Sequence, residues 1–157
     1  MLVSSGCEPD TSSGPYGSQA GILNTYVADK LHIIGLTEFV SDNDSRHWPK
    51  IRVYLDLLDK YDSRVKCPGV FRFELYNYTP RASESRGGRI HVWPDINLTD
   101  IDENNSYWKD HLRTYQFELY LDFEPIDGQK FILEATCIKP GGRRLSNIRL
   151  ITYNKSP

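Results

Sequence analysis

TYQFELYLDF, residues 114–123, is the stretch that decides the fold class. Apolar side chains occupy every second position, at Tyr115, Phe117, Leu119, Leu121 and Phe123. Successive side chains of a β-strand point to opposite faces, so this period places all of them on one face. The stretch therefore predicts a strand that buries one face and exposes the other.

The same alternation recurs on both sides of this strand. It is clearest in residues 51–58, where Ile51, Val53, Leu55 and Leu57 share a face. Further strands are predicted, about seven in all with the first, at residues 31–40, 51–58, 70–79, 89–93, 130–138 and 145–153. Turn-forming residues separate most of them.

One segment, residues 104–115, breaks the period of two. Trp108 and Leu112 are spaced as on one face of a helix, and Asn104 or Asn105 is suited to cap its start. The segment predicts one short helix.

Strands with one apolar face each must bury those faces against one another. Two stacked antiparallel sheets are the usual solution, so we expect an all-β fold, a sandwich of the immunoglobulin-like or transthyretin-like kind. A small closed barrel is the alternative. The length of 157 residues fits one domain, which we place at residues 24–157 behind a flexible tether at residues 1–23.

Composition excludes two classes of protein. The net charge is −2 and the charges are interspersed, so no basic stripe is present to bind nucleic acid. No apolar run reaches the length of a membrane-spanning helix.

The start of the chain suggests where the protein is located. VSSGC, residues 3–7, resembles the lipobox that ends the signal of bacterial lipoproteins, although Ser4 stands where that family prefers an aliphatic residue. The resemblance covers five residues. It implies cleavage before Cys7, a diacylglycerol on the Cys7 sulfur, a membrane anchor in the cell envelope and translation that begins upstream of Met1. The alternative is an ordinary N-terminus with a chance cysteine.

Two cysteines remain if Cys7 is lipidated. Cys137 falls on the inward face of its predicted strand, and Cys67 lies in a turn. They are either a disulfide or two buried thiols, and the sequence leaves both open. Neither has a second cysteine or histidine at metal-binding spacing.

The strongest polar cluster is DINLTDIDENN, residues 95–105. Oxygen ligands for calcium are offered by Asp95, Asp100, Asp102 and Asn104. Calcium is the one cofactor that the sequence suggests. The alternative is a solvated acidic loop.

Three tryptophans lie near loops or strand ends, at Trp48, Trp93 and Trp108. Exposed rings of this kind form flat platforms for sugars or peptides. The alternative is that they pack over sheet edges or under the helix.

Motifs for catalysis are absent from the sequence. It has no nucleophile elbow, phosphate-binding glycine loop or paired metal-binding histidines, so no catalytic residue is predicted. An enzyme with a carboxylate site built from Asp95 and Asp102 stays an alternative.

The sequence thus favours a lipid-anchored envelope protein whose β domain binds a protein or polysaccharide or has a structural role. A soluble carbohydrate- or calcium-binding module is the other candidate.

One further pattern has no place in either function. Five asparagines begin Asn-x-Ser/Thr sequons, at Asn43, Asn77, Asn97, Asn104 and Asn154. Composition alone suggests about one such sequon. Sequons are acceptors of glycans in eukaryotic secreted proteins and mean little in a bacterial lipoprotein.

Overall fold

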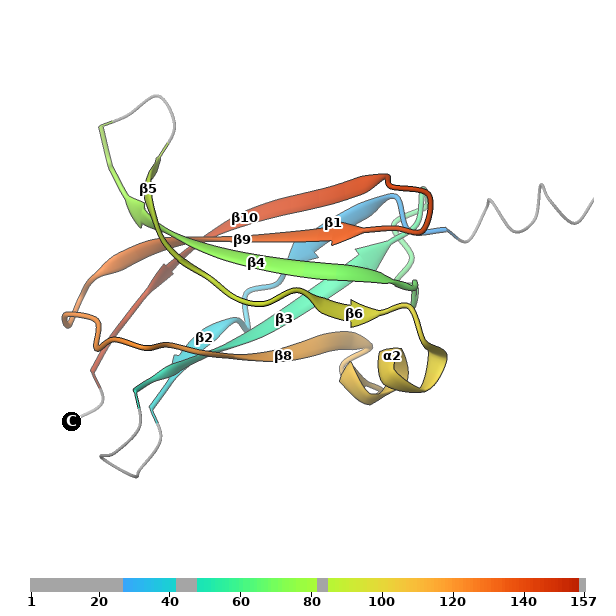
Figure 1. The fold of residues 1–157 in the computed structure, drawn as a ribbon, viewed down its shortest axis with the longest axis horizontal. Coiled ribbons are helices and arrows are strands. Elements are labelled where there is room, and N and C mark those ends of the chain that lie inside the picture. Colours follow the sequence, from blue (N-terminus) through green and yellow to red (C-terminus); the bar gives the residue numbers. More distant parts are fainter. Residues whose placement is uncertain (1–26, 42–47, 82–84, 156–157) are drawn as a thin grey trace, which may run out of the picture.

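Two antiparallel sheets make up most of the domain (Figure 1). The computed structural model describes residues 27–41, 48–81 and 85–155. Within these residues the elements, in chain order, are β1 (Lys30–Ile33), β2 (Glu38–Val40), β3 (Lys50–Leu58), β4 (Gly69–Tyr78), β5 (Arg86–Val92), β6 (Ile96–Leu98), α2 (Ile101–Tyr107), β7 (Trp108–Lys109), β8 (Thr114–Tyr120), β9 (Lys130–Ile138) and β10 (Arg144–Thr152). The predicted all-β class is confirmed.

The first sheet has the order β1-β3-β8-β7, and β2 also pairs with β3. The sequence predicted one strand over residues 31–40, but the structure divides it into β1 and β2. A turn at Gly35 and Leu36 separates them, and the hydroxyl of Thr37 accepts the backbone N–H of Tyr54 at 3.0 Å. The Thr37 side chain therefore replaces a ladder hydrogen bond where the strand is interrupted.

The second sheet has the order β10-β9-β4-β5, and β6 pairs with the first residues of β4. The strand pair β9 and β10 matches the prediction almost residue for residue. β6 and the two-residue β7 were missed, because three- and two-residue strands carry no periodic signal.

The core lies between the two sheets and is formed by the alternating residues of β3, β4, β8 and β9. Its largest fully buried rings belong to Phe71, Phe73, Tyr115, Phe117 and Phe131. Phe117 lies at the centre of the cluster, with ring centroids at 4.8 Å from Phe73 and 5.2 Å from Phe71. The inward face predicted for residues 114–123 is confirmed through Leu121, while Phe123 is half-buried beyond the end of β8.

The helix begins earlier than predicted. Asp100 is the N-cap, and its Oδ1 accepts the backbone N–H groups of Asp102 and Glu103, each at 3.0 Å. Asn104 lies inside the helix, and Trp108 begins β7. The prediction of an Asn104 or Asn105 cap was wrong because Asp100 offers the N-cap carboxylate four residues before Asn104.

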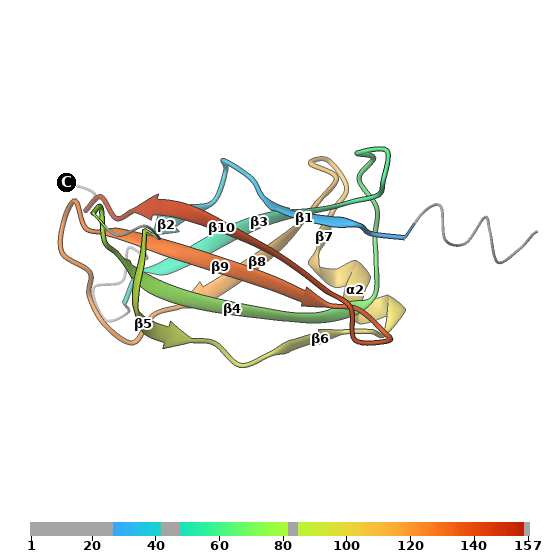
Figure 2. The same ribbon diagram turned by 90° about the horizontal axis from the view of Figure 1, so that it is seen from above.

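The described chain begins at the end of the domain that carries α2 and the β9–β10 turn (Figure 2). Lys139, nearly buried, donates from Nζ to the backbone carbonyl of Ala28 at 2.6 Å. Arg143, in the β9–β10 turn, forms an ion pair with Asp29. These two contacts fasten the first described residues to the second sheet.

No helix among the described residues has the length and apolarity needed to cross a membrane.

Candidate functional site

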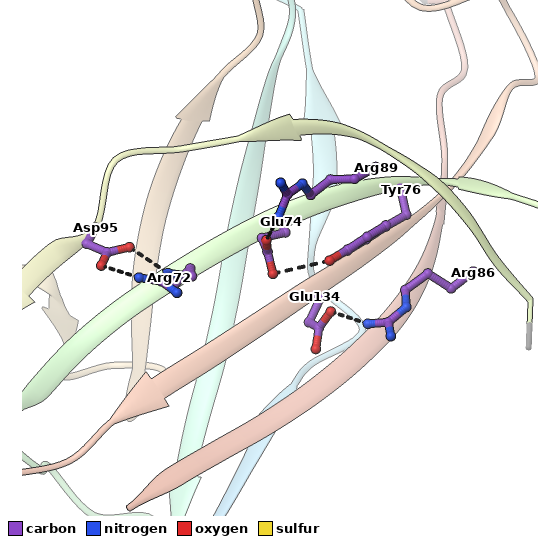
Figure 3. A network of polar contacts seen from close by, with 7 residues as sticks. All are labelled: Arg72, Glu74, Tyr76, Arg86, Arg89, Asp95 and Glu134. Carbon is purple, nitrogen blue, oxygen red and sulfur yellow. Dashed lines mark hydrogen bonds and ion pairs between the residues drawn. The ribbon is translucent and has the colours of Figure 1, made fainter. Parts of the chain in front are cut away.

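A network of charged side chains covers the outer face of the second sheet (Figure 3). We call it the charged face, and it consists of Arg72, Glu74, Tyr76, Arg86, Arg89, Asp95 and Glu134. The alternation that buries Phe71, Phe73 and Leu75 of β4 turns the intervening residues outward. The same alternation turns Glu134 outward from β9.

Two carboxylates of the charged face lie directly opposite each other. Glu74 of β4 and Glu134 of β9 are cross-strand partners in the register of the second sheet. Like charges in this position are destabilising. The pair needs cations from another element.

β5 supplies those cations. Arg89 binds Glu74 at 2.8 Å, and Arg86 binds Glu134. Arg86 also lies over the ring of Tyr76, 4.9 Å from its centroid, a cation–π contact. Register shifts between β4 and β5 accompany this arrangement, and two arginines of the edge strand reach carboxylates on two different strands (Figure 3).

Arg72 and Asp95 form a bidentate pair on the face. Two parallel bonds join them, Nε to Oδ1 at 2.9 Å and Nη2 to Oδ2 at 2.8 Å. The hydrogen bonds from Arg72 lower the pKa of Asp95, and the bonds to Asp95 raise the pKa of Arg72. Asp95 is therefore held as a carboxylate and is poorly suited to donate a proton.

Aliphatic groups adjoin the charges. Ile132 of β9, between Tyr76 and Leu150 in the register, is almost fully buried although it points outward. Leu150 and Ile148 of β10 are 45% and 56% exposed. Partial burial raises the pKa of the Tyr76 hydroxyl, which donates to Glu74 Oε2 at 3.2 Å. The face thus combines ion pairs with an exposed aliphatic strip.

In two of the three ion pairs of the face the arginine is clearly the more exposed partner, whereas Arg72 and Asp95 are about equally exposed. The side chains of Arg89 and Glu74 are 57% and 17% exposed, and those of Arg86 and Glu134 are 36% and 17%. In these two pairs the carboxylates lie beneath and the guanidinium groups lie outermost. A partner would therefore meet cations and aliphatic groups.

A pocket of about 650 Å³ opens beside α2, bordered by Cys67, Pro68 and Asn104 among others. The amide of Asn104 forms its inner wall. Nδ2 donates to the carbonyls of Cys67 and Leu98 at 3.1 and 3.0 Å, and Oδ1 accepts the hydroxyl of Tyr115 at 2.8 Å. The Tyr115 oxygen in turn accepts the N–H of Cys67 at 3.1 Å. These hydrogen bonds join α2 to the core, and both polar atoms of the Asn104 amide already have partners within the protein.

Both cysteines of the described chain, Cys67 and Cys137, are buried free thiols. The sequence left open whether these cysteines form a disulfide or remain two thiols, and the structure has two thiols. Burial raises the pKa of Cys137 to about 12, so the thiolate is scarcely present at neutral pH. Cys137 is a packing residue and not a nucleophile.

Cys137 also explains the glycine at position 69. A Cβ added to Gly69 would lie 2.7 Å from Cys137 Sγ. We expect Gly69→Ala to lower the free energy of unfolding by about 1–3 kcal/mol through overpacking. Cys137→Ala in the same chain should recover part of this loss, as measured by denaturant unfolding.

Gly88→Ala is the control, because a Cβ at Gly88 meets nothing within 4 Å. Equal losses at the two glycines, or no recovery in the Gly69→Ala/Cys137→Ala chain, would contradict this role of Cys137.

The four residues predicted as calcium ligands have different roles in the structure. Asp95 is bound by Arg72, Asp100 caps α2, Asn104 joins α2 to the core, and Asp102 lies exposed on the helix. Among residues 27–41, 48–81 and 85–155 no three His, Cys, Asp or Glu side chains gather to hold a metal ion. Asp95 lies in the loop before β6, and Asp102 lies on α2. Of these two carboxylates, Asp102 borders the pocket beside α2 and Asp95 does not.

The three tryptophans do not share one surface. Trp93 is buried, and its Nε1 donates to the carbonyl of Tyr120 at 2.6 Å. Trp108 packs edge-on against Tyr115. Trp93 contacts Tyr120, which is five positions and therefore about 17 Å from Tyr115 along β8, so the two tryptophans lie far apart. Trp48 is half exposed. The structure differs from the predicted platform because a hydrogen bond and a ring contact draw Trp93 and Trp108 inward.

The predicted lipidation site Cys7 and the tether at residues 1–23 lie outside the described residues. The period of two within residues 70–79 is sufficient to place Arg72 and Glu74 on the outer face, but it does not reveal Arg86 and Arg89 as their neighbours. Comparison of the chain with family models, with curated proteins and with solved structures gives no match.

Proposed function

We propose that this chain is a binding domain without catalytic activity that is exported, held at a membrane by a lipid on Cys7, and engages a protein partner through the charged face. The partner would offer acidic side chains beside apolar ones. The binding surface and the anchor lie on different parts of the chain and are tested separately.

The exposure of the arginines carries the proposal. A self-contained ion-pair network would gain nothing from having its guanidinium groups outermost, since exposed ion pairs contribute little to stability. Arginine beside aliphatic and aromatic side chains is typical of protein–protein interfaces. Ile148 lies opposite Glu134, the partner of Arg86, and Leu150 lies opposite Ile132, and both are about half exposed in the described chain.

The sheet order supports an immunoglobulin-like rather than a transthyretin-like sandwich. If β1 with β2, and β5 with β6, are each counted as one interrupted strand, the first, second and fifth strands form one sheet. The other sheet then holds the fourth, third, sixth and seventh strands. This is the order of an immunoglobulin constant-type domain with its fourth strand moved to the opposite sheet.

Crosslinking tests the binding surface. The full chain would carry a photoreactive amino acid at Ile148 and be irradiated in membranes of its own host. We expect a discrete crosslinked product that is lost when Arg89→Glu is added. The matched control carries the probe at Tyr61, which is exposed in the β3–β4 turn. The same products from both positions, or products insensitive to Arg89→Glu, would overturn this surface.

The anchor rests on the resemblance of residues 3–7 to the lipobox and on the composition of residues 8–21, which suits a tether. We expect the native protein in the membrane fraction to begin at Cys7 with an added diacylglyceryl group, as measured by the mass of its N-terminal peptide. A chain that begins at an unmodified Met1 in the soluble fraction would rule out the anchor but leave the crosslinking result to stand by itself.

A further inference from the structure

Sequons are unusually dense in this chain. Five of its eight asparagines begin Asn-x-Ser/Thr, and the structure describes four of these five. Asn77, Asn97 and Asn154 are exposed, whereas Asn104 is buried. The structure therefore separates the sequons that a modifying enzyme could reach from one that it could not.

Asn104 is closed to modification in the folded protein. Both atoms of its amide are used, by the carbonyls of Cys67 and Leu98 and by the Tyr115 hydroxyl. A sugar on Nδ2 would replace one of its two hydrogens, so at least one of the bonds to the Cys67 and Leu98 carbonyls would be lost, and the sugar would have to enter a buried position. This sequon serves as an internal negative control.

Asn97 has the opposite environment. It lies in β6, a three-residue strand that pairs with β4 and with no other strand of the described chain. Its Oδ1 accepts the N–H and the hydroxyl of Thr99, at 3.1 and 2.7 Å. Nδ2 has no hydrogen-bond partner in the described part of the chain.

Both polar residues of the Asn97 sequon thus stand in contact with each other. The Thr99 hydroxyl and N–H both bind the amide oxygen, so the hydrogen bonds of the sequon fix the side chain through Oδ1 and do not use Nδ2. Asn77 differs in that it lies in β4, an inner strand between β9 and β5, where it pairs with Phe131 of β9. The Asn154 sequon ends at Ser156, outside the described residues.

We infer that Asn97 is the acceptor of an Asn-linked glycan. The donor is an oligosaccharide on a polyprenyl pyrophosphate, presented on the export side of a membrane. Nδ2 of Asn97 attacks the first sugar carbon and forms a C–N bond. The bond from that carbon to the pyrophosphate oxygen breaks, the pyrophosphate leaves with the electron pair, and Nδ2 loses one proton. No oxidant or reductant is required.

A glycan at this position would cover an open sheet edge. The free side of β6 borders a groove of about 490 Å³ that is lined by Ile96, Gln116 and Glu118 among others. On the groove side, β7 pairs with Thr114 and Tyr115 alone, and no other strand of the described chain covers the rest of β8. Unpaired edges invite pairing with other chains, and bulky polar groups prevent it.

The glycan requires export alone, and because sequons mean little in a bacterial lipoprotein, a glycan at Asn97 would count against the lipid on Cys7. It would adjoin the Arg72–Asp95 pair of the charged face but not the aliphatic strip. Asn97 pairs with Val70 at the β6 end of β4. Ile132 pairs with Tyr76, six positions further along β4, and Leu150 pairs with Ile132 on its other side. The glycan and the aliphatic strip therefore occupy different ends of one face.

The test uses the protein isolated from its own host. A peptide amidase that removes Asn-linked glycans converts each occupied asparagine to aspartate, and fragment masses locate the conversion. We expect conversion at Asn97 and none at Asn104. An Asn97 that stays asparagine, with no glycan on its peptide before treatment, would overturn the inference.

Two variants at one position separate glycosylation from folding. Thr99→Ser keeps the sequon and should keep the glycan, while Thr99→Ala should lose it. Asn97→Gln, which keeps an amide, should lose it as well. All three chains are to be compared by thermal unfolding after glycan removal. A glycan retained at position 97 in Thr99→Ala would contradict the assignment of the site.

Discussion

Phe117→Ala is expected to lower the free energy of unfolding by about 3–5 kcal/mol, the usual cost of removing a fully buried aromatic ring. Its ring lies within 5.2 Å, between centroids, of Phe71 and of Tyr107 and within 4.8 Å of Phe73. These three neighbours come from β4 and from the end of α2. The cavity would therefore open between the two sheets, where no side chain can move in to fill it without breaking a strand.

Denaturant unfolding followed by tryptophan fluorescence measures the loss. Tyr120→Ala is the control, because Tyr120 lies on the same strand with 61% of its surface exposed. We expect Tyr120→Ala to cost less than about 1 kcal/mol. A similar loss from both variants would mean that β8 is stabilised by its backbone pairing and not by the aromatic core.

Asn104→Leu is expected to cost about 3–4 kcal/mol although it places an apolar residue in a buried position. The carbonyls of Cys67 and Leu98 and the hydroxyl of Tyr115 would each lose a partner inside the protein, and each unsatisfied group costs about 1–3 kcal/mol. Asn105→Leu, one residue further along, is the control. Asn105 is exposed, and its side chain accepts a hydrogen bond from Lys66 at the surface.

A double-mutant cycle identifies the cause of that loss. Tyr115→Phe removes the hydroxyl that Asn104 accepts, so the Asn104→Leu/Tyr115→Phe chain should lose less than the sum of the two single changes. Coupling of about 0.5–3 kcal/mol is typical of residues that share a hydrogen bond. Strict additivity would show that the two side chains stabilise the fold independently.

Periodicity was sufficient to find the long strands, because burial on one face leaves a mark at every second residue. It failed where a side-chain oxygen, and not a backbone carbonyl, accepts a backbone N–H group. Thr37 interrupts the first strand by accepting a ladder N–H, and Asp100 starts the helix by accepting two. Neither role changes the spacing of apolar residues, so neither could be seen in the pattern.

Asp56 shows the same limit from another direction. The alternation of β3 places it on the outer face, yet it is 3% exposed, because Arg64 from the following turn lies over it with Nε 3.1 Å from Oδ2. A cover of this kind depends on the path of a turn and not on the strand itself.

The candidate site was harder to predict than the fold. The outward positions of Arg72 and Glu74 followed from the period, but their meaning depends on register. Only the pairing of β4 with β9 places Glu74 opposite Glu134, and only the shifted pairing with β5 places Arg86 and Arg89 over them. For the tryptophans the sequence left exposure and packing both open, because position near a strand end does not determine exposure, and the hydrogen bond of Trp93 shows packing for that residue.

The two contacts that hold Ala28 and Asp29 have a mechanical consequence. A force that pulls the chain at Val27 would otherwise act first on β1, a four-residue strand at the edge of its sheet. Lys139 and Arg143 pass part of that force to β9 and the β9–β10 turn, and β9 is the central strand of nine residues in the other sheet. When force is applied to the first described residues, both sheets bear it before the edge strand β1 separates from β3.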